Sequence, residues 1–135
     1  MSNHENKLKH LEFIQAVISR MANNSFILKG WTATIVIALF TLEHFDSKGQ
    51  FLVIANYPIL VFWLLDAYFL SQERSCRALY EEVRNLPPDK IDFSMNVDKY
   101  YRGRNTWLGS VWSGTLLIFY VGIMWLILWV INFIG

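Results

Sequence analysis

Residues 105–135 read NTWLGSVWSGTLLIFYVGIMWLILWVINFIG. This stretch contains no aspartate, glutamate, lysine or arginine. A helix needs about 20 consecutive apolar residues to cross a bilayer. A soluble chain of 135 residues has too small an interior to bury such a stretch. The sequence therefore predicts an integral membrane protein, with a transmembrane helix over residues 107–133.

The composition of the whole chain supports this prediction. Apolar residues make up 54% and charged residues 17% of the sequence, whereas soluble domains average about 45–50% and about 25%. The formal net charge of +1 gives no general field that would attract nucleic acid. The single cysteine, Cys76, has no partner for an intramolecular disulfide, and we expect it to pack as a spectator in a helix.

The sequence carries no signature of enzymatic or metal chemistry. His4, His10 and His44 are scattered, and there is no HExxH motif, phosphate-binding glycine loop or serine elbow. We therefore expect a protein that is not an enzyme and has neither a metal nor a cofactor.

Two further apolar runs lie upstream, over residues 26–42 and 51–70. The polar segment between them, EHFDSKGQ, is short enough to require a tight hairpin of antiparallel helices. At about 1.5 Å per residue the first run rises roughly 26 Å, near the lower limit for a span. Pro58 lies early in the second run, where a membrane helix tolerates the missing amide, with or without a kink.

An amphipathic helix is predicted over residues 8–28, ahead of the first span. Apolar residues form a stripe along one face of this helix, and polar residues fall mainly on the other faces. The segment is therefore too polar to cross a bilayer. It either lies in the plane of the membrane surface or packs against other helices of the chain. We expect a bend at Asn23, Asn24 and Ser25, which are weak helix formers. The apolar stripe comprises Leu8, Leu11, Ile14, Val17, Ile18, Met21 and Ser25.

The helical pattern continues beyond the second span, over residues 71–86, but becomes strongly charged. Nothing interrupts it before Pro87 and Pro88. We expect one helix from about residue 51 to 85 that leaves the membrane, followed by a linker over residues 87–106 with one short helix.

Opposite charges in this helical extension are spaced for pairing along the helix. The expected pairs are Glu73 with Arg77 and Arg77 with Glu81, with Arg74 and Arg84 close by. These residues either stabilise a solvated helix or form a docking surface for a soluble partner.

Lysine and arginine are concentrated on one side of the predicted spans. The hairpin carries only Lys48. By the positive-inside rule, the N-terminus and residues 71–106 face the cytoplasm, and Gly135 lies on the opposite side. The remaining basic residues are Lys7, Lys9, Arg20, Lys29, Arg74, Arg77, Arg84, Lys90, Lys99, Arg102 and Arg104.

Asp66 is the one carboxylate within an apolar run. An ionised carboxylate in hydrocarbon costs from about 2.5 kcal/mol upward, so such a group marks function by default. Lys29 enters the membrane at a similar depth and is the expected partner, with Arg20 as a second candidate. The carboxylate either holds helices together or contributes to an ion pathway, together with Thr34 and Asn56.

Small residues in the last apolar run predict close helix packing. Ser110, Gly114 and Gly122 fall on one face of the expected helix, at offsets of 0, 4 and 12 positions. Small side chains allow helix backbones to approach each other in lipid.

Two stretches carry a resemblance of layout to a known group. FIQAVISRMANNSFILKGW (13–31) and FWLLDAYFLSQERSCRALYEEVR (62–84) resemble the SLATT group of small bacterial inner-membrane proteins, which are two-span effectors of antiviral defence systems. The resemblance covers residues 13–84, and the third span departs from the two-span layout. It implies a homo-oligomer that disrupts the membrane when a partner senses infection, with Asp66, Glu73 and Arg74 as positions of interest.

We therefore expect an all-α integral membrane protein of one domain, with its C-terminus in the periplasm. It should comprise an amphipathic N-terminal helix, a hairpin of two spans with a cytoplasmic extension, and a third transmembrane helix. The expected function is that of an oligomeric inner-membrane effector that forms a pore or perturbs the bilayer. The alternative is a membrane anchor or scaffold that recruits a soluble partner through residues 71–106.

Overall fold

The computed structural model of the chain describes residues 2–46 and 49–134, and every regular element in those ranges is a helix. This confirms the all-α prediction. Three runs, Asn3–Phe45, Gln50–Asn85 and Gly114–Phe133, are long and apolar enough to cross a membrane, as in a multi-pass membrane protein. Lys48 and Gly135, which the predicted orientation uses, lie outside the described residues.

In chain order the elements are α1 (Asn3–Asp46), α2 (Gln50–Asn85), three 3-10 turns η1 (Pro88–Lys90), η2 (Asp98–Tyr100) and η3 (Gly103–Asn105), α3 (Trp107–Val111), α4 (Gly114–Leu116), the π-helical η4 (Leu117–Val121) and α5 (Gly122–Ile134).

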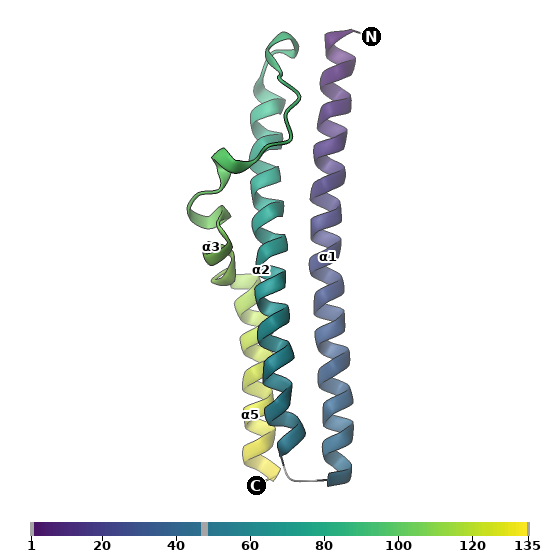
Figure 1. Cartoon of the computed structure of the whole chain (residues 1–135), viewed down its shortest axis with the longest axis vertical. Coiled ribbons are helices and arrows are strands. Elements are labelled where there is room, and N and C mark those ends of the chain that lie inside the picture. The colour runs from purple at the N-terminus through teal and green to yellow at the C-terminus, as the bar shows by residue number, and fades with distance from the viewer. Residues whose placement is uncertain (1, 47–48, 135) are drawn as a thin grey trace.

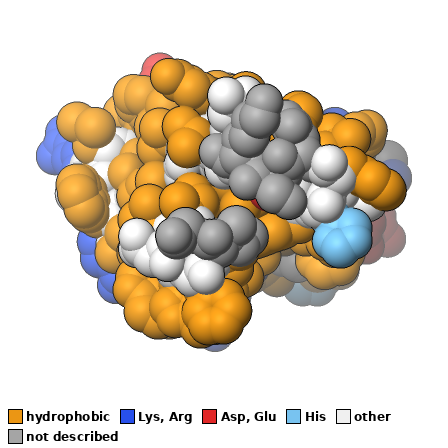
Figure 2. All heavy atoms as spheres, turned by 90° about the horizontal axis from the view of Figure 1, so that it is seen from below, with side chains coloured by type: hydrophobic (Ala, Val, Ile, Leu, Met, Phe, Trp, Pro, Cys, Tyr) orange, Lys and Arg blue, Asp and Glu red, His pale blue; other side chains and the backbone are white. Residues whose placement is uncertain are grey.

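The molecule is a long antiparallel hairpin of α1 and α2, with the rest of the chain packed along it (Figure 1). The last helical run lies beside the first part of α2. We call this end of the molecule the apolar half (residues 26–46, 50–70 and 114–134). The linker returns along the other end of the molecule, which we call the polar half (residues 3–25 and 71–106). Seen from the tip of the apolar half, hydrophobic side chains make up most of the visible surface (Figure 2).

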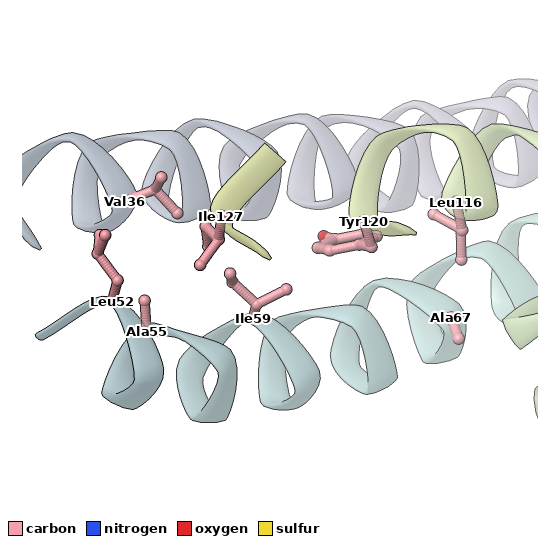
Figure 3. Packing of buried hydrophobic residues seen from close by; sticks show 8 residues of the cluster. All are labelled: Val36, Leu52, Ala55, Ile59, Ala67, Leu116, Tyr120 and Ile127. Atoms are coloured by element: carbon pink, nitrogen blue, oxygen red, sulfur yellow. The ribbon is translucent and has the colours of Figure 1, made fainter. Parts of the chain in front are cut away.

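Each half has its own buried core. The side chains of the first cluster fill the space between α1, α2 and the C-terminal run (Figure 3). The second cluster joins α1 to α2 and the linker in the polar half. The first cluster comprises Val36, Leu52, Ala55, Ile59, Ala67, Leu116, Tyr120 and Ile127, and the second comprises Ile14, Ile18, Cys76, Leu79, Val83 and Ile91.

Polar contacts close the two ends of the hairpin. Gly49 precedes α2 with a φ of 71°, a left-handed conformation that glycine adopts without steric cost. The carboxylate of Glu43 accepts the backbone N–H groups of Gly49 and, at 3.2 Å, of Phe51, so the end of α1 satisfies the open donors at the start of α2.

At the other end, Lys7 Nζ donates to the carbonyl oxygens of Arg84 (3.0 Å) and Leu86 (2.8 Å). A lysine is favourable there, because the last carbonyls of a helix lack backbone partners and carry partial negative charge.

The predicted bend in the first segment is wrong, because α1 runs unbroken through Asn23, Asn24 and Ser25. Intrinsic propensity is a weak preference that packing overrides. Ile14 and Ile18 are buried against α2 on one side of this region, and Ser25 bonds to Asp66 of α2. The amphipathic segment therefore packs against another helix of the chain, the second of the two predicted alternatives.

Helix α2 has the predicted extent. It continues through Pro58 and on into the charged region without a break, and ends at Asn85. Its 36 residues rise roughly 54 Å, well beyond the hydrocarbon thickness of about 30 Å. The linker differs from the prediction in having three 3-10 turns where one short helix was expected.

The predicted helix over residues 107–133 is interrupted. Ser113 has an extended backbone (φ −60°, ψ 138°), so α3 ends at Val111 and the long apolar run begins at Gly114. The indole N–H of Trp63 donates to the carbonyl of Val111 at 3.1 Å, and this contact replaces a helical hydrogen bond. The indole N–H of Trp107 similarly donates to the carbonyl of Leu64 at 2.9 Å and fixes α3 against α2.

The polar-half core can be tested through Cys76, which is 5% exposed and whose thiol pKa is raised by burial. Ile14→Ala removes a fully buried side chain from the same cluster and should destabilise the fold by about 2–5 kcal/mol. We expect Cys76 to react faster with a maleimide in this variant than in the wild type, and the exposed-site control Gln15→Ala to leave the rate unchanged. Equal rates in all three proteins would show that this core does not protect the thiol.

Candidate functional site

Asp66 lies fully buried where the three apolar runs meet. Lys29 Nζ of α1 is 2.6 Å from Asp66 Oδ2, and the hydroxyl of Tyr120 donates to the same oxygen at 2.8 Å. The hydroxyl of Ser25 donates to Oδ1 and accepts from Lys29 Nζ at 2.8 Å. We call Ser25, Lys29, Asp66 and Tyr120 the junction cluster.

The predicted pairing of Asp66 with Lys29 is therefore present. The alternative pairing with Arg20 is absent among the described residues, and the Arg20 side chain is exposed. The reason is position along α1: Lys29 follows Ser25 by one helical turn, and both side chains face the same point on α2.

Tyr120 reaches the cluster from a π-helical turn, Leu117–Val121. Turns of π-helix are rare in proteins, but those that occur are often found at functional sites. Trp63 stacks on the Tyr120 ring with centroids 6.2 Å apart and planes at 8°, and Phe119 meets it edge-on at 4.9 Å. The phenol is thus held by aromatic neighbours on two sides.

The electrostatics of the cluster favour a closed structural pair. Both carboxylate oxygens of Asp66 accept hydrogen bonds, and one ammonium offsets the one carboxylate. A buried ion pair adds little net stability, but removing one partner is costly because it strands a charge. The Lys29 side chain is 20% exposed and Asp66 is 0% exposed, so only the lysine end of the pair reaches the surface of the bundle.

The other polar residues of the predicted ion pathway do not join this cluster. The Thr34 hydroxyl donates to the carbonyl of Gly30 at 2.9 Å, and the Asn56 amide donates to Val53 at 3.2 Å. Each is satisfied by its own helix; Thr34 is exposed and Asn56 is half-buried. Within one chain, the structure does not bring Asp66, Thr34 and Asn56 into a common path.

Sequence reasoning missed the roles of Ser25 and Tyr120. The sequence pattern places Ser25 in the apolar stripe and at a bend, and it places Tyr120 within an apolar run. The available signal was chemical, because a tyrosine hydroxyl in an apolar segment needs a hydrogen-bond partner when it is buried.

The charged residues of α2 are only partly arranged as predicted. Arg77 pairs with Glu73 at 2.8 Å, but Glu81 lies 3.5 Å from Arg84 and does not pair with Arg77. The physical reason is that Nε and Nη2 of Arg77 both donate to Glu73. Arg77, Glu81 and Arg84 are largely exposed, so each pair contributes little stability. Arg74 instead donates to the carbonyl of Arg104 in η3 at 2.6 Å.

The predicted helix-packing face is divided by the break at Ser113, and its two glycines make no close packing contact within the chain. Ser110 is buried on α3, on the other side of the break from Gly114 and Gly122. A Cβ atom added at either glycine would meet nothing within 4 Å. A different outward face carries small residues on α1, where Gly30, Thr34 and Ala38 follow each other at intervals of four and are all exposed.

An apolar pocket of about 460 Å³ lies in the polar half, between α1 and the linker. Its aromatic and methionine side chains are well exposed: Phe13 at 67%, Phe93 at 46% and Met95 at 41%. The ring of His10 forms the buried part of the wall, edge-on to Phe93 with centroids 5.4 Å apart. Burial lowers the pKa of His10, and the charge of Asp92 partly opposes this shift. Sequence reasoning assigned no role to these residues.

Among the described residues, no three His, Cys, Asp or Glu side chains are grouped as metal ligands. No family model, curated protein or solved structure matches the chain.

In the junction cluster, we expect removal of the lysine and removal of the aspartate to reduce stability by different amounts. Lys29→Met leaves the fully buried Asp66 without a cation, whereas Asp66→Asn leaves a lysine that can extend toward the surface. Breaking a buried pair costs about 3–5 kcal/mol, and we expect Lys29→Met to lose more unfolding free energy than Asp66→Asn. The measurement is unfolding in detergent, followed by tryptophan fluorescence.

The double variant Lys29→Met with Asp66→Asn is the control, because it removes both charges and should recover much of the loss. A Lys29→Met protein as stable as the wild type would show that the pair does not hold the helices together.

Proposed function

We propose that the chain is a non-enzymatic inner-membrane anchor and scaffold, which presents its polar half to a soluble partner in the cytoplasm. The apolar half would span the bilayer three times, with the N-terminus and residues 71–106 inside and the C-terminus outside. The positive-inside rule supports this orientation, and the division of the molecule into an apolar and a polar half supports the placement of the polar half outside the bilayer.

The apolar pocket of the polar half carries the proposal. Exposed apolar side chains need no explanation in the apolar half, because lipid would cover them. In the polar half they would face water, and clustered exposed hydrophobic residues there mark an interaction surface. Phe13, Phe93 and Met95 gather at one pocket, and binding energy concentrates on aromatic anchors in such pockets.

The unbroken helices explain how an anchor would hold this surface. α1 continues from the apolar into the polar half, so the pocket lies on a helix that also contributes Ser25 and Lys29 to the junction cluster. The pocket would therefore be presented at a fixed height above the membrane. The exposed side chains of Glu81 and Arg84 would supply a charged rim for the same partner.

Co-purification tests the scaffold. Phe13→Asp should reduce recovery of a dominant soluble partner by about tenfold or more, since it removes an anchor side chain. Arg84→Glu should have a smaller effect, because exposed rim charges contribute little. The measurement is quantitative mass spectrometry after purification from native membranes in mild detergent.

Leu8→Asp is the matched control, because Leu8 is exposed on α1 but outside the pocket. Recovery of the same partner by the Phe13→Asp protein would contradict the proposal.

A second function, that of an oligomeric effector which opens a pore or perturbs the membrane in antiviral defence, is favoured by the outer face of α1. Gly30, Thr34 and Ala38 leave this face open for close approach of a second copy. Because Asp66 is enclosed, any pathway would run between copies rather than through one chain. The layout resemblance to the SLATT group supports the same function.

The effector function predicts a consequence of blocking that face. On induced expression, the wild type should form cross-linkable oligomers and depolarise cells, and Gly30→Leu should abolish both because its side chain keeps backbones apart. Gly122→Leu, on the other open glycine face, is the control and should retain both. Induced wild-type cells that keep their membrane potential would count against the pore and leave the scaffold untouched.

A further inference from the structure

A small basic pocket lies where the apolar and polar halves meet. Its volume is about 250 Å³, and its lining residues are Arg74 and Arg77 of α2 with Arg104 and Asn105 of η3. Two hydrogen bonds hold the turn against the helix: Ser71 donates to the carbonyl of Asn105 at 2.6 Å, and Arg74 donates to that of Arg104 at 2.6 Å. The basic side chains are thus brought together by backbone contacts that do not depend on the Arg104 side chain.

The positive charge of this pocket is only partly neutralised within the chain. Glu73 pairs with Arg77, and it is the one acidic residue among those that perturb Arg74. Burial and the nearby charge of Arg104 lower the pKa of Arg74, against the opposing effect of Glu73. Like charges held together in this way repel each other, and a bound anion would remove the repulsion.

The position of the pocket along α2 indicates the source of such an anion. Arg74 follows Leu70, the last residue of the apolar run, by one helical turn, which is a rise of roughly 6 Å. The headgroup layer on each side of a bilayer is about 5–8 Å thick. Trp107 contacts Leu64 on the apolar side of the pocket, as expected of an aromatic residue at the membrane interface.

We propose that Arg74, Arg77 and Arg104 bind the headgroup phosphate of an anionic phospholipid in the cytoplasmic leaflet. Arginine suits this role because its planar fork of donors matches phosphate oxygens. Basic pockets on the cytoplasmic side of membrane proteins are established lipid sites in general. This inference rests on the membrane placement in the proposed function, but not on the soluble partner or the pore.

The test compares phosphatidylglycerol with phosphatidylcholine. Native mass spectrometry of the detergent-purified chain, titrated with each lipid, should show tighter retention of phosphatidylglycerol by the wild type. Arg104→Gln should weaken that retention about tenfold, the effect of losing one charge-assisted contact, while Arg104→Lys should recover part of it. Arg102→Gln is the matched control, since Arg102 is exposed in the same linker and outside the pocket.

The remaining outcomes separate the alternatives. Equal retention of both lipids by the wild type would overturn the lipid site. So would an Arg104→Gln protein that retains phosphatidylglycerol as tightly as the wild type does, with an unchanged Cys76 labelling rate showing that its fold is intact. Displacement of phosphatidylglycerol by millimolar inorganic phosphate would overturn it in favour of a soluble phosphate ligand. Failure of the reconstituted chain to float with phosphatidylcholine vesicles would instead contradict the membrane placement on which both proposals rest.

Discussion

The architecture depends on the need of one buried carboxylate for partners. Asp66 is fully enclosed between the helices of the apolar half, with no surface exposed to its surroundings. A charge in such a place must be paired and hydrogen-bonded within the protein. Lys29 and Ser25 of α1 and Tyr120 of η4 meet this need. One side chain of α2 thereby specifies how the other two apolar runs are placed beside it, in both height and rotation.

This placement has consequences far along the hairpin. Because α1 and α2 continue without a break into the polar half, the register set at Asp66 also aligns Ile14 with the residues around Cys76. The same register places Lys7 at the end of α2. Glu43 closes the opposite end by capping α2. Contacts at both ends and at the middle hold the two helices together, which would suit the membrane-anchored platform proposed above.

The surfaces left over by this packing are chemically distinct and separated in space. The apolar pocket belongs to α1 and the linker, the basic pocket to α2 and η3, and the open face with Gly30 to the apolar half of α1. A soluble partner, a lipid headgroup and a second copy of the chain would therefore not compete for the same residues. The scaffold and the effector functions are compatible, since an oligomer of anchors would present several pockets at one membrane surface.

The sequence by itself determined the features that depend on order along the chain. Apolar run lengths predicted the three candidate spans, the short polar segment predicted the hairpin, and the distances of Lys29 and Asp66 from the ends of their runs predicted the ion pair. Tertiary structure alone decided what depends on rotation and lateral contact. Packing kept α1 straight through Asn23, and Trp63 took the carbonyl that a continuous C-terminal helix would have used. Tyr120 lies in a π-helical turn and faces inward. Phe13 and Phe93, which are 80 positions apart in the sequence, line the same pocket. The periodicity of apolar residues and the position of a residue within an apolar run can both be read along the sequence. The partner of a side chain, in contrast, is set by which helices lie beside it.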